Sequence, residues 1–288
     1  MTSRRVLAAL AALVLPLALL AAAPTSDAAS AASSWAPAAK ATITPGVMMY
    51  TKGAQCTANF VFRDAAGHTY VGYAAHCAGT GSSTDTNGCT TKSLPLGTRV
   101  RFASDGNVAD PGTTVGRGRL VYSSWIAMHR LGTKAGNTCA YNDLALVRVG
   151  RKYVRHVNPT VPFWGGPTGL AKRTGTASGD RVYSYGNSSL RGGAQPLSPK
   201  TGSSLGDAAR HWSHNVETAT PGIPGDSGSG FMTAHGLALG VLSTVELAPL
   251  PGANGVGDLP RELAFAQRHS GIGGLHLVKG TKKFNPVL

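Results

Sequence analysis

The feature that most constrains the fold is a succession of short apolar segments, each interrupted after a few residues by Gly, Asn, Asp or Pro. Runs of this length between turn residues are typical of β-strands. A turn at residues 64–67 joins two of them into a hairpin. The sequence therefore predicts an all-β protein. Its strand candidates are residues 46–50, 56–62, 68–73, 115–122, 144–149, 181–185 and 237–242.

One convincing helix is expected, close to the end of the chain. It begins near the cap candidate Asp258, has Pro260 in its first turn, and runs to His269 with Gly271 behind it. Earlier in the chain, Asn, Pro and Gly accumulate between residues 157 and 169, which indicates a link between two subdomains. The sequence shows no repeat of solenoid period.

The N-terminus has the layout of a signal peptide. Arg4 and Arg5 precede an apolar run at residues 6–23, and small residues follow, so we expect cleavage after Ala29. A membrane anchor is the alternative, because about 18 apolar residues can just span a bilayer. Pro16 and the many alanines argue against it. We therefore expect a secreted, extracellular protein, exported by the Sec or the twin-arginine route.

The chain is strongly basic, with 27 Lys and Arg against 13 Asp and Glu and a formal net charge of +14. These basic residues are scattered along the sequence, without interleaved aromatics or a recognisable nucleic-acid module. We interpret the excess as a solubilising surface that can also adhere to acidic cell-wall polymers. We expect no nucleic-acid partner, and no membrane partner once the signal is removed.

Three short motifs, far apart in the sequence, carry side chains with catalytic potential. Residues 224–230 read Pro-Gly-Asp-Ser-Gly-Ser-Gly and set Ser227 among glycines that tolerate strained backbone. His76 is followed by a cysteine, and Asp143 is followed by an apolar run. Taken singly, the serine fits a turn, the histidine an ordinary hydrogen-bonded side chain, and the aspartate a cap at a strand entry.

In the order His, Asp, Ser, these motifs resemble the chymotrypsin-like serine peptidases of bacterial secreted type. The resemblance implies two antiparallel six-stranded β-barrels with the triad in the cleft between them, and a C-terminal helix. It divides the chain into a signal peptide (1–29), a short Ala/Ser-rich segment (30–42), a first barrel with His76 and Asp143 (43–157), a second barrel with Ser227 (158–257), and a C-terminal helix and tail (258–288).

The resemblance also implies a role for each residue. Ser227 would be the nucleophile, His76 the general base and later the acid, and Asp143 the group that orients the imidazole. The backbone N–H groups of Gly225 and Ser227 would form the oxyanion hole. Such a protein is a serine-type endopeptidase that cleaves polypeptides through an acyl-enzyme. We expect it to need no cofactor or metal, to be a monomer, and to be open to a proteinaceous inhibitor.

The four cysteines allow three disulfide pairings in an oxidising compartment. The resemblance implies a bridge between Cys56 and Cys77 beside the catalytic histidine, which leaves Cys89 with Cys139. Zinc binding is the alternative, but the sequence contains no CxxC pair.

By the same resemblance, Ser243, Thr244 and Val245 are expected to line the specificity pocket. Pro221 occupies the position at the pocket base where trypsin-like members carry aspartate. We therefore expect a preference for small or medium apolar side chains immediately before the scissile bond. A basic preference is the competing interpretation, because Glu246 could supply a displaced carboxylate.

The chain departs from the family pattern at its expected N-terminus. It lacks an Ile-Val-Gly-Gly type start after a basic cleavage site, so a newly formed N-terminus is not expected to pair with Asp226. An arginine side chain is the alternative partner in some bacterial relatives. We therefore expect activity without zymogen cleavage.

Two other functions remain open on the sequence alone. One is a secreted esterase or lipase on a different fold, although the serine motif does not complete a G-x-S-x-G elbow. The other is a peptidase-like binding protein without turnover, although all three reactive side chains are present. His211 and His214 lack an evident third ligand, so we expect a surface loop there rather than a metal site.

Overall fold

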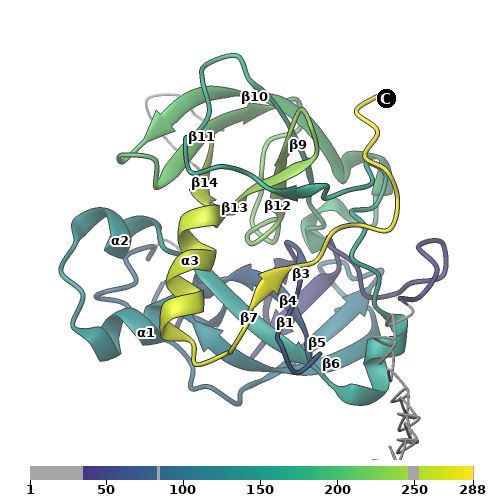
Figure 1. Cartoon of the computed structure of the whole chain (residues 1–288). Coiled ribbons are helices and arrows are strands. Elements are labelled where there is room, and N and C mark those ends of the chain that lie inside the picture. Colours follow the sequence, from purple (N-terminus) through teal and green to yellow (C-terminus); the bar gives the residue numbers. More distant parts are fainter. Residues whose placement is uncertain (1–34, 83–84, 246–252, 288) are drawn as a thin grey trace, which may run out of the picture. The chain divides into compact units, whose positions relative to one another are not determined.

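The strands of the chain form two separate sheets (Figure 1). The computed structural model describes residues 35–82, 85–245 and 253–287. The expected signal peptide, residues 1–29, and Glu246 lie outside these ranges. The first sheet contains strands β1 to β7 and β15, and the second contains β8 to β14.

The first sheet closes into a six-stranded antiparallel barrel. β2 (Ala54–Thr57) pairs with β1 (Met48–Thr51), and β3 (Val61–Arg63) pairs with β4 (Thr69–Ala74). Residues 58–60 also bond to both neighbouring segments, so β2 and β3 are two halves of one bent strand that closes the ring. The other strands are β5 (Arg99–Ser104), β6 (Thr113–Ser123) and β7 (Leu144–Val149), and β15 (His276–Leu277) extends the sheet beside β3.

The second sheet closes in the same way. Its order is β12-β9-β10-β11-β14-β13, and a pairing of β12 with β13 completes a ring of antiparallel strands, which β8 joins in parallel. The predicted pair of six-stranded barrels is thereby confirmed. The strands are β8 (Gly169–Leu170), β9 (Arg181–Tyr185), β10 (Pro199–Ala208), β11 (Ser213–Thr218), β12 (Gly230–Thr233), β13 (Leu237–Val245) and β14 (Asn254–Asp258).

The barrels are held together by apolar side chains that alternate with polar ones along the strands. In β6, Gly118 and Leu120 are buried whereas Arg117 and Arg119 are exposed, so the strand has an inner and an outer face. Each buried Val, Leu or Phe contributes roughly 1.5–3 kcal/mol. A core cluster of the second barrel consists of Val182, Val216, Phe231, Leu239, Leu242 and Val256.

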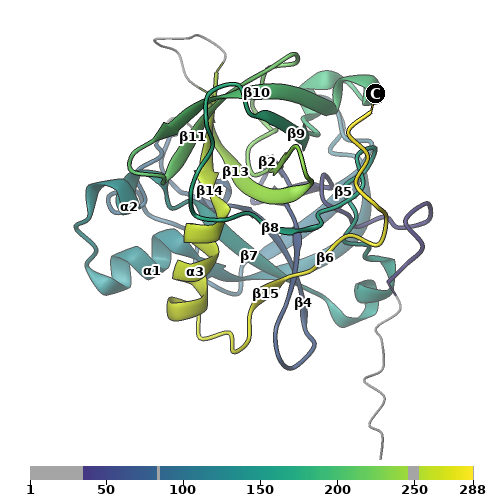
Figure 2. The same ribbon diagram turned by 45° about the horizontal axis from the view of Figure 1, so that its top comes forward.

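The predicted C-terminal helix is present as α3 (Leu259–His269). Its N-terminus is capped as expected, because the Asp258 side chain accepts a hydrogen bond from the backbone N–H of Arg261. The helix packs against β13 of the second barrel, and against β7 and α1 (Ser124–Leu131) on the side of the first barrel (Figure 2). It therefore bridges the two barrels.

The prediction of a single helix is wrong. The structure also contains α1 and α2 (Gly136–Tyr141), both inserted between β6 and β7. α2 includes Gly136, Asn137 and Thr138, which are weak helix formers, and the Cys139 disulfide fixes it. None of the described helices is long and apolar enough to cross a bilayer. Short 3₁₀ turns are η1 (Ala75–Ala78), η2 (Arg151–His156), η3 (Ser189–Arg191) and η4 (Gln195–Leu197).

Candidate active site

Strand pairing brings His76 and Asp143 together. His76 follows β4 in the turn η1, Asp143 directly precedes β7, and these two strands are antiparallel neighbours. Asp143 Oδ1 accepts the backbone N–H of His76 at 2.8 Å, and Oδ2 lies 2.6 Å from His76 Nδ1. The aspartate side chain is 1% exposed and the imidazole 16%. The carboxylate thus fixes both the position and the orientation of the ring.

The electrostatics of this pair favour a base at the outer ring nitrogen. Burial by itself would lower the pKa of His76, but the charge of Asp143 and its hydrogen bond raise that pKa above its ordinary value. With Nδ1 donating to the carboxylate, Nε2 carries the lone pair that can accept a proton. This is the tautomer that general-base catalysis requires.

Two further residues, from the second half of the chain, hold Asp143. Ser243 Oγ in β13 donates to Asp143 Oδ2 at 2.6 Å. Glu262 Oε1 in α3 accepts the backbone N–H of Asp143 at 2.7 Å. Burial raises the pKa of Glu262 well above its ordinary value, which favours the neutral form of its carboxyl group. This contact of Glu262 could not be predicted from the sequence, because an acidic residue in a first helical turn is ordinary.

The motif that contains Ser227 lies against the end of β2. The carbonyl of Ser227 accepts the backbone N–H of Thr57 at 2.8 Å. The neighbouring Cys56 is bridged to Cys77, which directly follows His76. The described atoms include no hydrogen bond between Ser227 Oγ and the imidazole. Such bonds are often long without substrate and tighten in the complex.

The predicted oxyanion donors are unpaired within the described chain. The N–H groups of Asp226 and Gly228 donate to the carbonyls of Ile223 and Leu242, whereas those of Gly225 and Ser227 donate to no described atom. Gly225 has a φ of +96°, and a β-carbon there would lie 2.1 Å from Gln55 Oε1. Only glycine therefore fits this turn, which leaves two neighbouring donors for a ligand oxygen.

Both expected disulfides are present. The Cys56–Cys77 bridge has a Cα–Cα distance of 6.2 Å, and the Cys89–Cys139 bridge one of 5.1 Å. The first restrains the turn that carries His76. The second fastens α2, the segment just before Asp143. No cysteine in the described part of the chain is free.

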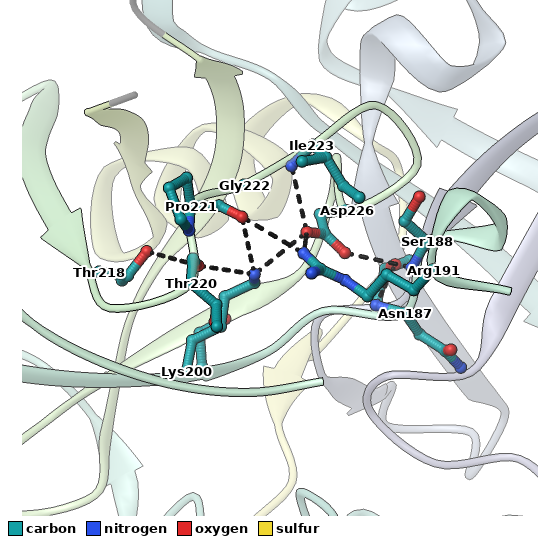
Figure 3. A network of polar contacts seen from close by, with 12 residues as sticks. Asn187, Ser188, Arg191, Lys200, Thr218, Thr220, Pro221, Gly222, Ile223 and Asp226 are labelled. Atoms are coloured by element: carbon teal, nitrogen blue, oxygen red, sulfur yellow. Dashed lines mark hydrogen bonds and ion pairs between the residues drawn. The ribbon is translucent and has the colours of Figure 1, made fainter. Parts of the chain in front are cut away.

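A buried ion network surrounds Asp226, the residue before Ser227 (Figure 3). Arg191 Nη2 lies 2.5 Å from Asp226 Oδ2, and Lys200 Nζ lies 3.2 Å from the same oxygen. The arginine partner is the one that the resemblance allowed. Lys200 was not expected; its side chain is fully buried, and its Nζ also donates to the carbonyls of Thr220 at 2.9 Å and Pro221 at 3.1 Å. Burial lowers the pKa of Lys200, and Asp226 counteracts this.

The expected pocket residues do not all have the same surroundings. Pro221 contributes its carbonyl to the ion network, where it also accepts from Arg191 Nη2 at 3.3 Å. The side chain of Ser243 donates a hydrogen bond to Asp143. Thr244 and Val245 continue β13 beside Gly255 and Asn254 of β14.

His214 is not in a surface loop, so that expectation is wrong. It lies in β11 and is completely buried, with Nδ1 2.7 Å from Asp207 Oδ1 and Nε2 3.2 Å from Asp258 Oδ2. His211 also pairs with Asp207. Among the described residues, one group of potential metal ligands is closely spaced: His76 with Cys56 and Cys77. Those two sulfurs form a disulfide and offer no thiolate.

Neither a family model nor a curated protein sequence matches the chain. Similar solved structures include Thermobifida fusca protease A, with 20% identity and a TM-score of 0.48 over 83% of this chain and 99% of that chain. Nocardiopsis protease has 18% identity and a TM-score of 0.46 over 82% and 98%. A glutamic acid specific serine protease has 16% identity and a TM-score of 0.48 over 82% and 100%. The assignment of a chymotrypsin-type fold rests on the strand order and on where the three motifs lie in it.

Proposed function

We propose that this protein is a secreted serine endopeptidase with His76, Asp143 and Ser227 as its triad. The observation that carries the proposal is the pair of hydrogen bonds that the Asp143 carboxylate accepts from the backbone N–H and Nδ1 of His76. These bonds leave Nε2 free to act as a base. The fold agrees with this reading, and it removes the esterase alternative that required a different fold.

The reaction follows from these groups. Ser227 Oγ attacks the carbonyl carbon of the substrate and gives its proton to His76 Nε2, while Asp143 stabilises the imidazolium. The N–H groups of Gly225 and Ser227 stabilise the developing oxyanion; one such donor is worth about 3–4 kcal/mol. The C–N bond then breaks as Nε2 protonates the leaving amine. Water repeats the sequence on the acyl-enzyme and regenerates the serine.

The proposed enzyme prefers small or medium apolar residues before the scissile bond. The resemblance assigns the pocket base to Pro221 rather than to a carboxylate, and the carbonyl of Pro221 belongs to a network of two cations and one carboxylate. The resulting positive charge opposes an Arg or Lys side chain. A panel of peptides that differ only at this residue tests the preference through kcat/KM. Faster cleavage after Arg or Lys than after Ala, Val or Leu would refute it.

The proposed enzyme is active without trimming of its N-terminus. Arg191 and Lys200 neutralise Asp226 from within the folded chain, so no new α-amino group is needed to order the nucleophile loop. Two disulfides agree with an oxidising, extracellular location. We further propose that the enzyme is a monomer that acts on polypeptides and needs no cofactor.

A serine-directed fluorophosphonate probe tests the proposal directly. The untrimmed chain starting near Ser30 should be labelled, and Ser227→Ala should abolish labelling and peptide hydrolysis together. Ser229→Ala is the matched control, because this serine lies in the same motif and should leave labelling intact. A folded chain that resists the probe would instead favour the peptidase-like binding protein. Labelling that appears only after trimming would contradict activity without zymogen cleavage.

A further inference from the structure

Arginines form a row across the outer face of the first barrel. Arg99 in β5 is the direct cross-strand partner of Arg119 in β6, and Arg119 is the partner of Arg148 in β7. Arg117 lies two residues before Arg119 on the same face of β6, and its partner in β5 is Arg101. The basic residues that look scattered in the sequence are therefore gathered by the strand register.

This arrangement is unfavourable for the isolated protein. Like charges placed directly opposite each other destabilise a sheet. Within the described chain, no Asp or Glu forms an ion pair with any arginine of the row, since the acidic partners recorded there belong to other sites. The row therefore keeps its full positive charge toward solvent.

The arginines line a hollow of about 590 Å³. Its described lining contains no carboxylate and shares no residue with the candidate triad. The pKa of Tyr153, which also lines the hollow, is lower than its ordinary value. The main cause is a hydrogen bond with Arg117, and the positive charge of Lys152 adds to it. The cations of this basic hollow are Arg99, Arg117, Arg119, Arg148, Arg151 and Lys152.

We propose that the basic hollow binds a linear acidic polysaccharide. The planar guanidinium group bonds carboxylate, sulfate and phosphate through paired N–H donors, and five of the six cations are arginines. Adjacent strands lie about 4.8 Å apart, so the row Arg99, Arg119, Arg148 repeats its charge at a distance comparable to one sugar unit. A chain of anionic sugars laid across the strands meets one arginine after another and relieves their mutual repulsion.

The same surface is poorly suited to nucleic acid. Single-stranded nucleic acid is held by bases stacked on aromatic side chains. The hollow contains one aromatic ring, Tyr153, and Lys152 Nζ lies 5.1 Å from its centroid. Its lining comes from strands and the 3₁₀ turn η2, so no α-helix is available to enter a major groove. A hollow with many cations and a single aromatic ring therefore favours an acidic polysaccharide over nucleic acid as its ligand.

Calorimetric titration with a heparin-derived decasaccharide tests the proposal, because this probe carries both sulfate and carboxylate groups. The double variant Arg99→Gln/Arg119→Gln should weaken binding about tenfold or more, since two charge-assisted contacts are lost. Lys172→Gln/Arg173→Gln is the matched control: both side chains are exposed in the segment between β8 and β9, and the change in net charge is the same. The control should bind like the natural sequence.

A single variant, Arg148→Gln, leaves the Arg99–Arg119 pair in place and should weaken binding less. Urea unfolding of each variant verifies that it is folded. Equal weakening in both double variants would show that only total charge matters and would overturn the site, as would no binding by the natural sequence at about 0.15 M salt. Tighter binding of an oligothymidylate or a poly-glutamate peptide through the same arginines would overturn the polysaccharide assignment. None of these readouts depends on peptidase activity.

Discussion

At the scale of single residues, Asp143 is the centre of the candidate site because hydrogen bonds hold both its carboxylate and its backbone N–H. Its carboxylate accepts hydrogen bonds from the backbone N–H and Nδ1 of His76 and from the hydroxyl of Ser243. Its own N–H donates to the side chain of Glu262. A carboxylate bonded on both oxygens cannot rotate away from the imidazole. It therefore determines which ring nitrogen is left to act as a base.

Asp143→Asn should lower turnover by about 10⁴-fold, because the amide cannot hold the same tautomer. The pKa of His76 is raised by the charge of Asp143, and that charge is lost in the variant. Activity requires neutral His76 and falls as pH drops through this pKa, so the acid limb of kcat/KM should move to lower pH. Asp207→Asn, which removes a carboxylate bonded to other histidines, should leave the limb in place. An unmoved limb in Asp143→Asn would contradict the assigned role.

The site residues that could be identified from the sequence are those that lie in recognisable short motifs. His76, Asp143 and Ser227 each have distinctive neighbours in the sequence, and the paired cysteines follow from the same resemblance. Glu262 and Lys200 could not be found in this way. A glutamate early in a helix and a lysine in a strand are usually solvated, and only the packing of the folded chain buries these two side chains.

At the scale of elements, α3 is attached to the first barrel by a hydrogen bond, in which Glu262 of the helix accepts the backbone N–H of Asp143. The carboxyl group is fully buried, and its neutral form is favoured. The helix itself was predictable, because Asp258 and Pro260 are strong start signals. The helices α1 and α2 were not, since the first is short and the second depends on a disulfide. The strand predicted at residues 56–62 is divided where it bends to close the barrel, which periodicity does not reveal.

Glu262→Gln should change how stability depends on pH. Because burial raises the folded-state pKa of Glu262, the neutral carboxyl stabilises the fold fully below its ordinary value of 4.5, and this contribution is lost as pH rises through the raised pKa. Glutamine keeps an acceptor for the Asp143 N–H and does not titrate. The free energy of unfolding in urea should therefore shift in favour of the variant between about pH 5 and about pH 8.

Glu262→Ala is the companion variant. It leaves the Asp143 N–H buried and unpaired, which costs about 1–3 kcal/mol at either pH. If glutamine and glutamate gave parallel pH profiles, the buried carboxyl would not be the titrating group.

At the scale of the whole molecule, charge is distributed unevenly. The sequence showed the net charge of +14 but not where the cations lie, because strand register decides which side chains become neighbours. The ion network around Asp226 was equally hard to predict. Its cations are Lys200 and Arg191, which come from outside the three motifs.

Arg119→Gln should raise the thermal unfolding temperature at low ionic strength, because Arg119 faces Arg99 on one side and Arg148 on the other. Salt screens this repulsion, so the difference should shrink when salt is raised to about 1 M. Differential scanning calorimetry measures both effects. Arg173→Gln removes an exposed charge outside the row and should change the temperature much less. A gain that persists in high salt would point to packing rather than repulsion.

The residues that hold Asp143 are synthesised long after Asp143 itself. Ser243 and Glu262, which hold this residue, lie 100 and 119 positions further along the polypeptide. A ribosome-bound intermediate can complete the first barrel while its carboxylate still lacks both supports. The hydrogen bonds that hold Asp143 are therefore complete only after the last helix of the chain has been synthesised.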